Sequence, residues 1–336
     1  MAKHATGWWI SGDDSGTPTI QFRTDISPVE LGDDADVLVE VTHSALNYKD
    51  ALAISGNPGV IRTLPLIPGI DAVGTVAESS DRRFAVGSSV VLTGFGYGET
   101  RHGGLATSLR AVGDHLVSLP GGLSHEQAAA YGTAGFTAAL ALHALEKAGL
   151  TPENQQMPIA VSGAAGAVGS LAMLFLSRRG FHVTAITGRT DEHEYLKSMG
   201  ANEILSRQEV LSWPERPLLS ERFGGVIDQA GGPLLARLLA STNSSGVVAS
   251  CGLAGGSDLP TTVMPFILRG ITLTGINSVY QPLDVRRALW QECAALAGEI
   301  PWSALIKRIR LEDAETVATH VLVGATRGRV VVEMPR

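Results

Sequence analysis

One glycine-rich segment constrains the fold of this chain more than any other feature. The segment Gly163-Ala-Ala-Gly166-Ala-Val-Gly169 stands between an apolar strand-like run, 158–162, and a helix-like run, 170–179. Its glycines, with the small Ala165 at the middle position, let the backbone approach a pyrophosphate and let the helix pack closely on the strand. A structural turn is the alternative explanation. The strand, loop and helix context favours dinucleotide binding.

Strands and helices alternate along the chain after this segment. Further strands are expected at 182–186, 203–205, 225–228, 246–250 and 271–274, with helices at 170–179, at 192–198 and between 228 and 246. Such alternation is typical of βαβ units. It predicts an α/β fold with a doubly wound parallel sheet over residues 126–280.

The first 125 residues have a different pattern. Short strand-like runs at 37–41, 74–78 and 89–93 are separated by Gly and Pro, which predicts a β-rich domain. A long helix is expected at 123–149. Residues 281–336 contain a helix-like run, 282–297, and a strand-like run, 328–333. We expect that last strand to return to the first domain.

Composition excludes several classes of protein. Charged residues make up 18% of the 336 residues and the mean hydropathy is +0.16, which excludes a disordered chain. The net charge of −7 argues against a general nucleic-acid binder. The two cysteines, Cys251 and Cys293, are too few for a disulfide framework or a four-cysteine zinc site. Because no HExxH motif occurs either, no metal site is expected.

An uncharged stretch, 128–145, is long enough to raise the question of a membrane span. It consists mostly of Ala, Gly and Thr, which transfer poorly into lipid, so a buried helix is the better interpretation. The first ten residues hold no apolar run of signal-peptide length. We therefore expect a cytoplasmic protein that has neither a membrane nor a nucleic acid as a partner.

The residues after the second strand of the α/β region distinguish NAD from NADP. Thr187, Gly188 and Arg189 lie about 25 residues after Gly163, where an NAD site usually has a carboxylate. The first carboxylate here is Asp191. A hydroxyl, a bare backbone and a guanidinium suit a 2′-phosphate, because Arg binds phosphate bidentately. The alternative is an exposed arginine in a surface turn.

The order of these segments resembles the medium-chain dehydrogenase/reductase superfamily, in which a GroES-like catalytic domain accompanies a Rossmann domain. Ile70 stands where the zinc alcohol dehydrogenases carry a ligating His, which points to the zinc-free branch. The blocks 46–53, 67–71, 132–138, 193–198 and 251–256, collinear over about 36–332, resemble the acrylyl-CoA reductase group, also described as quinone oxidoreductases. The resemblance implies a GroES-like domain at 1–125, a Rossmann domain at 126–280 and a return to the first domain at 281–336. It also implies a homodimer that pairs through the strand at 271–274.

The same resemblance implies which residues form the site. Tyr48, in the block Asn47-Tyr48-Lys49-Asp50, would contact the cofactor near the nicotinamide and is the candidate proton donor. The alternative is that Tyr48 only packs against the nicotinamide or ribose. Asn47 and Asp50 are expected to fix the loop rather than to act on the substrate.

The remaining cofactor contacts are distributed over both domains. The resemblance places Ala165, Gly166, Ala167 and Val168 at the pyrophosphate; Thr187, Gly188 and Arg189 at the 2′-phosphate; Arg207 at the adenosine end; Leu253, Ile267 and Ser278 on the nicotinamide side; and Arg329 at the edge of the pocket. Without the resemblance, Arg207 and Arg329 would be interpreted as surface arginines.

The implied reaction is the reduction of acrylyl-CoA to propionyl-CoA with NADPH. A hydride goes to the β-carbon and a proton to the α-carbon, and the cofactor supplies the hydride chemistry. A reductase of quinones or other small enones would share this machinery. A non-enzymatic NADPH-binding sensor is the alternative from another class. Arg62, Arg101 and Arg269 are candidates to bind the phosphates of CoA.

Overall fold

The computed structural model describes residues 4–12, 17–32 and 35–335 and divides them into two compact units. Unit 1 comprises the residues up to Phe136 and those from Ser278 onward, and unit 2 is Thr137–Asn277. The expected boundary at 125/126 falls at the start of a helix, α2 (His125–Lys147), whose last part belongs to unit 2. The expected boundary at 280/281 lies close to Ser278.

Unit 2 is built on a six-stranded parallel sheet. The order across the sheet is β10 (Glu203–Ser206), β9 (Val183–Thr187), β8 (Ile159–Ser162), β11 (Phe223–Asp228), β12 (Thr242–Ser250) and β13 (Thr272–Gly275). Every neighbouring pair is parallel. The chain winds from β8 outward to β10 and then from β11 outward to β13, so β8 and β11 meet at the switch point of the sheet. The predicted doubly wound sheet is confirmed.

Helices connect the strands of unit 2. They are α3 (Ala167–Arg178), α4 (His193–Ser198), α5 (Arg207–Ser212), α6 (Gly232–Ser241) and α7 (Met264–Arg269), with the 3-10 turn η2 (Thr190–Glu192) before α4. On α6, Leu234 and Leu238 lie one turn apart and are buried against Val226 and Val248 of the sheet. This apolar stripe holds α6 on the sheet.

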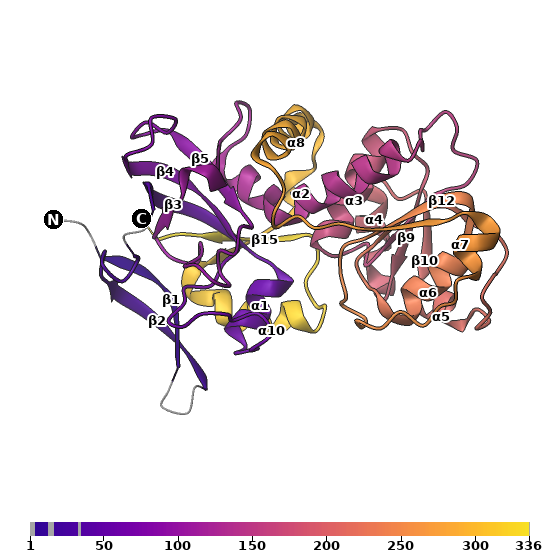
Figure 1. Cartoon of the computed structure of the whole chain (residues 1–336), viewed down its shortest axis with the longest axis horizontal. Coiled ribbons are helices and arrows are strands. Elements are labelled where there is room, and N and C mark those ends of the chain that lie inside the picture. The colour runs from indigo at the N-terminus through magenta and orange to yellow at the C-terminus, as the bar shows by residue number, and fades with distance from the viewer. Residues whose placement is uncertain (1–3, 13–16, 33–34, 336) are drawn as a thin grey trace. The chain divides into compact units, whose positions relative to one another are not determined.

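A seven-stranded sheet forms the core of unit 1. Its order is β14 (Ile306–Arg310), β15 (Arg329–Glu333), β3 (Val37–Leu46), β4 (Asp71–Ser79), β5 (Ser89–Thr93) and β7 (Leu116–Ser118), and β6 (Ser108–Ala111) also pairs with β3. The yellow β15 runs antiparallel beside the indigo β3, although unit 2 separates them in the sequence (Figure 1). A hairpin of β1 (Ala5–Gly12) and β2 (Pro18–Ile26) adds a second, two-stranded sheet.

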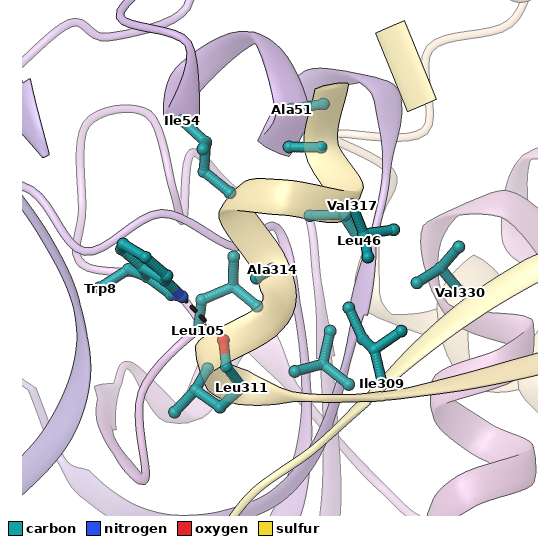
Figure 2. Packing of buried hydrophobic residues seen from close by; sticks show 12 residues of the cluster. Trp8, Leu46, Ala51, Ile54, Leu105, Ile309, Leu311, Ala314, Val317 and Val330 are labelled. Carbon is teal, nitrogen blue, oxygen red and sulfur yellow. Dashed lines mark hydrogen bonds between the residues drawn. The ribbon is translucent and has the colours of Figure 1, made fainter. Parts of the chain in front are cut away.

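The helices of unit 1 pack on these strands. Besides the first part of α2 they are α1 (Tyr48–Ile54), α8 (Leu283–Leu296), α9 (Trp302–Leu305) and α10 (Ala314–Leu322), with the 3-10 turns η1 (Gly113–His115), η3 (Ala297–Glu299) and η4 (Leu311–Asp313). Figure 2 shows the cluster in which Ile54 of α1 meets Val317 of α10. The indole of Trp8 is buried there and donates to the carbonyl of Leu311 at 2.8 Å. Segments from both ends of the chain therefore share one core.

Helix α2 is the one helix of the described residues that is long and apolar enough to cross a membrane. Of its most apolar window, 78% is buried inside the protein, as in a core helix. The helix is interrupted at Gly132, where φ is 43° and ψ is −151°. A Cβ at Gly132 would lie 2.4 Å from a carboxylate oxygen of Asp71, so only glycine fits at this break.

Candidate functional site

The glycine segment forms a cradle at the carboxyl end of β8. Gly163 has φ +56°, a left-handed conformation that favours glycine. A Cβ at Gly169 would lie 2.5 Å from the carbonyl oxygen of Gly163, so the loop and α3 touch only because that residue is glycine. Gly166 is the N-cap of α3 and no acidic residue occupies the first turn, which leaves the helix N-terminus open to an anion. These residues fit a pyrophosphate.

The predicted 2′-phosphate residues lie at the carboxyl end of β9. Thr187 is buried and its hydroxyl accepts a hydrogen bond from the backbone of Arg189 at 3.0 Å. A Cβ at Gly188 would lie 2.9 Å from Nη2 of Arg207, so that guanidinium passes directly over the bare backbone. Because β10 lies beside β9 with Ser206 opposite Thr187, the sheet brings Arg207 to the same edge. Arg207 is exposed, and Arg189 lies 3.8 Å from the carboxylate of Glu192.

Two loops follow β11 and β12 at the carboxyl ends of these strands, next to the glycine cradle after β8. Asp228 is fully buried; its carboxylate accepts from the hydroxyl of Ser162 at 2.6 Å and from the backbone of Gly231 at 2.8 Å. Its backbone carbonyl accepts from the backbone N–H of Cys251 at 2.8 Å. Burial and the nearby Asp228 raise the pKa of the Cys251 thiol to about 12, so this cysteine is held as a thiol. The carboxylate of Asp228 thus ties the end of β8 to the loop after β11.

The predicted nicotinamide-side residues of unit 2 are exposed apolar side chains. Leu253 follows β12 and is 60% exposed, and Ile267 on α7 is 70% exposed. Apolar side chains left open to solvent on a folded unit are typical of surfaces that something covers. Their contact with a nicotinamide stays a prediction.

Tyr48 is the first residue of α1 in unit 1 and is 41% exposed. Asn47 is the N-cap, and its backbone N–H donates to the carboxylate of Asp50 at 2.8 Å, while its side-chain amide donates to the same oxygen at 3.0 Å. The other oxygen of Asp50 accepts from the backbone of Ile70 at 2.8 Å. Burial and the neighbouring Asp71 raise the pKa of Asp50 to about 7. The structure therefore gives Asn47 and Asp50 the predicted role of fixing the loop.

A buried ion pair lies next to this cap. Arg329 is 0% exposed and its Nη2 lies 3.4 Å from the carboxylate of Asp71, while Nη1 donates to the side-chain oxygen of Asn47 at 2.9 Å. Nε donates to the carbonyl of Ala130 at 2.7 Å. The interpretation of Arg329 as a surface arginine is wrong, because its charge is compensated inside unit 1. Its contact with a cofactor stays a prediction.

Ser278 is held by a second buried arginine that sequence reasoning missed. Arg286 of α8 is 1% exposed and its Nη2 donates to the carbonyls of Ser278 and Val279, both at 2.8 Å. Its guanidinium carbon lies 4.3 Å from the ring centre of Phe95 and 4.7 Å from that of Phe136. Burial lowers the pKa of Arg286 to about 10. No sequence signal distinguishes it from the adjacent, exposed Arg287.

The three arginines considered for CoA differ in availability. Arg269 is committed to unit 2, because it donates to the carbonyls of Ala240 at 2.8 Å and Thr242 at 2.9 Å and also pairs with Glu221. Its interpretation as a CoA contact is therefore not supported. Arg62 and Arg101 are exposed.

Comparisons with known proteins assign the chain to a family. The alcohol dehydrogenase GroES-like domain matches residues 33–135, and the zinc-binding dehydrogenase model matches residues 167–295. The acrylyl-CoA reductase AcuI of Ruegeria pomeroyi is 45% identical over 299 residues, which are 89% of this chain and 90% of that protein. The chain belongs to the acrylyl-CoA reductase group of the medium-chain dehydrogenase/reductase superfamily. This confirms the resemblance and the GroES-like and Rossmann fold classes.

Two solved structures extend the comparison. The yhdH oxidoreductase from Salmonella enterica in complex with NADP has a TM-score of 0.91 at 44% identity, covering 98% of this chain and 100% of that one. Bacillus subtilis protein yhfP with NAD bound has a TM-score of 0.90 at 39% identity, covering 99% of this chain and 100% of that one. Relatives of similar likeness thus differ in the dinucleotide they hold.

One of the two family models is described as zinc-binding, which raises the question of whether this chain has a zinc site. Within residues 4–12, 17–32 and 35–335, no group of three or more His, Cys, Asp or Glu is placed to hold a metal ion. Ile70, at the position that carries a zinc-ligating His in other branches, is buried.

Proposed function

We propose that this protein reduces acrylyl-CoA to propionyl-CoA with NADPH. The observation that carries the proposal is the match, over about nine-tenths of both chains, with an acrylyl-CoA reductase. The glycine cradle of unit 2 is consistent with the dinucleotide, and the arginine that crosses Gly188 is consistent with its 2′-phosphate. A yhdH oxidoreductase holding NADP supports the same choice of cofactor.

The cofactor contacts are proposed from the family resemblance, together with the glycine cradle and the strand ends described above. Ala165 to Val168 present backbone N–H groups at the N-terminus of α3 to the pyrophosphate. Thr187, Gly188, Arg189 and Arg207 take the adenosine 2′-phosphate. Leu253, Ile267 and Ser278 border the nicotinamide, and Tyr48 and Arg329 contribute from unit 1. NADPH supplies the hydride when bound.

Tyr48 is proposed to act on the substrate. As the β-carbon is reduced, negative charge develops on the thioester oxygen and the α-carbon needs a proton. The phenol of Tyr48 carries an O–H group that can donate a hydrogen bond or a proton at this point. The cap formed by Asn47 and Asp50 fixes the start of α1, the backbone from which the side chain of Tyr48 extends.

The activity is tested by following NADPH oxidation at 340 nm with acrylyl-CoA, crotonyl-CoA, a benzoquinone and a small enone, and with NADH in place of NADPH. We expect the highest kcat/KM with acrylyl-CoA and NADPH. A higher kcat/KM with the quinone would contradict the proposal and indicate a quinone reductase. Tight NADPH binding without turnover of any of the four would support a sensor instead.

The role of Tyr48 is tested with Tyr48→Phe, which keeps the ring and removes the hydroxyl. We expect kcat to fall tenfold or more while the NADPH affinity changes little, because the ring still packs. Tyr280→Phe, at another exposed tyrosine of unit 1, is the matched control and should retain full turnover. Unchanged kcat in Tyr48→Phe would eliminate the proton-donor role and leave only the packing role.

The choice of NADPH is tested with Arg189→Ala. We expect this variant to lose most of its preference for NADPH over NADH, because the 2′-phosphate of NADPH loses a bidentate partner. Arg216→Ala, at an exposed arginine of the same unit, should keep the preference. A retained preference in Arg189→Ala would refute the assignment.

The protein is proposed to form a homodimer through β13. This strand ends the order of the described sheet, so one of its edges pairs with no described strand. Val263, the N-cap of α7, and Leu268 of α7 are exposed large apolar side chains in the segment just before β13. A second copy that extends the sheet would use such an edge. Light scattering should give twice the mass of one chain for the wild type and a shift to monomer for Thr272→Lys; a monomeric wild type contradicts the proposal.

The cytoplasm is the proposed location. Both cysteines are free thiols, Cys293 buried and Cys251 partly buried, as is usual in a reducing compartment. Fractionation of cells that produce the tagged protein should recover it with the soluble cytoplasmic markers.

A further inference from the structure

The side-chain NH2 group of Gln229, at the switch point of unit 2, has no hydrogen-bond partner among the described residues. The nitrogen of this group, Nε2, is buried. A buried amide without a partner loses its bonds to water and gains none in return, so such groups are rare unless a ligand completes them. Gln229 is the first residue after β11, at the edge of a parallel sheet where ligands bind.

The amide of Gln229 faces the glycine cradle. A Cβ at Gly163 would lie 3.5 Å from Oε1 of Gln229, so the side chain reaches the first glycine of the segment. The loop after β12 approaches from the other side, where a Cβ at Gly252 would lie 2.4 Å from the backbone oxygen of Gln229. Gln229 therefore lies between the pyrophosphate cradle and the loop that carries Leu253.

The backbone of Gln229 is fixed on both sides. Its N–H donates to the hydroxyl of Ser162 at 3.0 Å, and its carbonyl accepts from the N–H of Ala254 at 3.3 Å. Ser162 is in turn bonded to the buried carboxylate of Asp228. A side chain on such a fixed backbone gives up little conformational freedom when it binds, which favours a ligand-binding role.

We propose that Gln229 is a further cofactor-binding residue, whose amide donates to an acceptor oxygen on the nicotinamide half of the dinucleotide, either of the pyrophosphate or of the adjoining ribose. The strand order supports this half, because the proposed 2′-phosphate residues lie at the carboxyl ends of β9 and β10, on the opposite side of β8 from β11. The inference rests on the proposed use of NADPH and adds a residue that the resemblance does not supply.

The test compares NADPH with 2′,5′-ADP, which carries the adenosine end without the nicotinamide half. Gln229→Met keeps the length of the side chain and removes the amide. We expect NADPH affinity, measured by fluorescence titration, to fall about three- to tenfold, as for the loss of one hydrogen bond. Affinity for 2′,5′-ADP, measured by calorimetry, should remain within twofold of the wild type. The matched control is Gln291→Met, at an exposed glutamine of α8, which should change neither affinity.

A second variant tests the sign of the charge next to the phosphates. Gln229→Glu places a carboxylate there, so NADPH affinity should fall further than in Gln229→Met, and the deficit should grow as the ionic strength is lowered. Gln229→Asn keeps the amide but shortens the side chain by one methylene. It should also weaken the binding of NADPH and leave the binding of 2′,5′-ADP unchanged. Gln229→Asn replaces Gln229→Met if that variant does not give a folded protein by circular dichroism.

Two results would overturn the proposal. NADPH affinity within twofold of the wild type in the amide-removing variant would show that the amide makes no contact. An equal loss of affinity for NADPH and 2′,5′-ADP would show that the substitution distorts the unit instead. Neither titration contains an acyl-CoA, so a wild type that binds NADPH but does not reduce acrylyl-CoA fails the proposed activity and leaves this inference standing.

Discussion

Removing the charge of Asp71 should strongly destabilise unit 1. Four donor groups converge on its two carboxylate oxygens: the backbone N–H of Thr133 at 2.8 Å, the hydroxyl of Thr133 at 2.6 Å, the amide of Asn47 at 2.9 Å and the guanidinium of Arg329 at 3.4 Å. Asp71→Asn offers one acceptor oxygen and one NH2 group, so at least one donor then faces another donor. The charge of Arg329, fully buried, loses its partner.

The expected loss follows from the burial of both charges. Removing one member of a fully buried ion pair costs about 3–5 kcal/mol, because the remaining charge stays buried. Urea unfolding followed by tryptophan fluorescence measures this loss, since Trp8, Trp9, Trp290 and Trp302, four of the five tryptophans, belong to unit 1. Arg329→Met should cost a similar amount. The double variant should cost at least ~1 kcal/mol less than the sum of the two, because neither charge remains without its partner.

The control uses an ion pair at the surface. Arg310 and Glu312 lie 3.2 Å apart with side chains 71% and 42% exposed, so Glu312→Gln should cost less than about 1 kcal/mol. A loss below about 1 kcal/mol in Asp71→Asn, or strict additivity in the double variant, would refute the reasoning that the pair is buried and mutually dependent.

Three further variants test other parts of the structure. Because the pKa of Asp50 is raised to about 7, the folded state keeps a proton that the unfolded chain loses above about pH 4. The free energy of unfolding of the wild type, relative to that of Asp50→Asn, should therefore fall as the pH rises from about 4.5 to about 7.5 and then level off. Equal pH profiles of the two proteins in urea unfolding would contradict this. Gly169→Ala should lower the free energy of unfolding by about 1–3 kcal/mol and weaken NADPH binding, because its Cβ would overlap the glycine cradle. Gly298→Ala, with open space around it, should change the stability little in thermal unfolding. Arg286→Met should cost about 1–3 kcal/mol in the same measurement, because the carbonyl of Ser278 and the hydroxyl of Thr93 lose a donor. Exposed Arg287→Met should be within about 0.5 kcal/mol of the wild type.

Local patterns in the sequence predicted unit 2 well. The glycine segment and the strand at 158–162 are adjacent in the chain, and the parallel sheet follows from the repetition of short strands and helices. The guanidinium of Arg207 lies over Gly188, because neighbouring parallel strands end at one edge of the sheet, although only the family resemblance had singled out Arg207. In each case the physical cause acts over a few residues or one βαβ unit.

Unit 1 was predicted less completely, because its determining contacts join distant residues. The helix expected at 123–149 contains a break at Gly132, where the carboxylate of Asp71 in β4 leaves no room for a Cβ. Helix α1 has seven residues and gives too short a periodic pattern to be recognised. Arg329 bonds to Asn47 and Asp71, and Arg286 donates to the hydroxyl of Thr93, all far away in the sequence, so no local pattern distinguishes these two arginines from surface arginines.

The position of β15 between β14 and β3 has a consequence for synthesis of the chain. Asp71 leaves the ribosome 258 residues before Arg329, which at about 5–20 residues per second is roughly 10–50 s. During that time unit 2 is completed, while the edge of β3 is open and Asp71 has no guanidinium to pair with. The nascent first unit is therefore an incomplete sheet, in which β3 pairs with β4 and β6 but has no partner at 43–46 on the edge where β15 later pairs, and it becomes whole only when β15 is added.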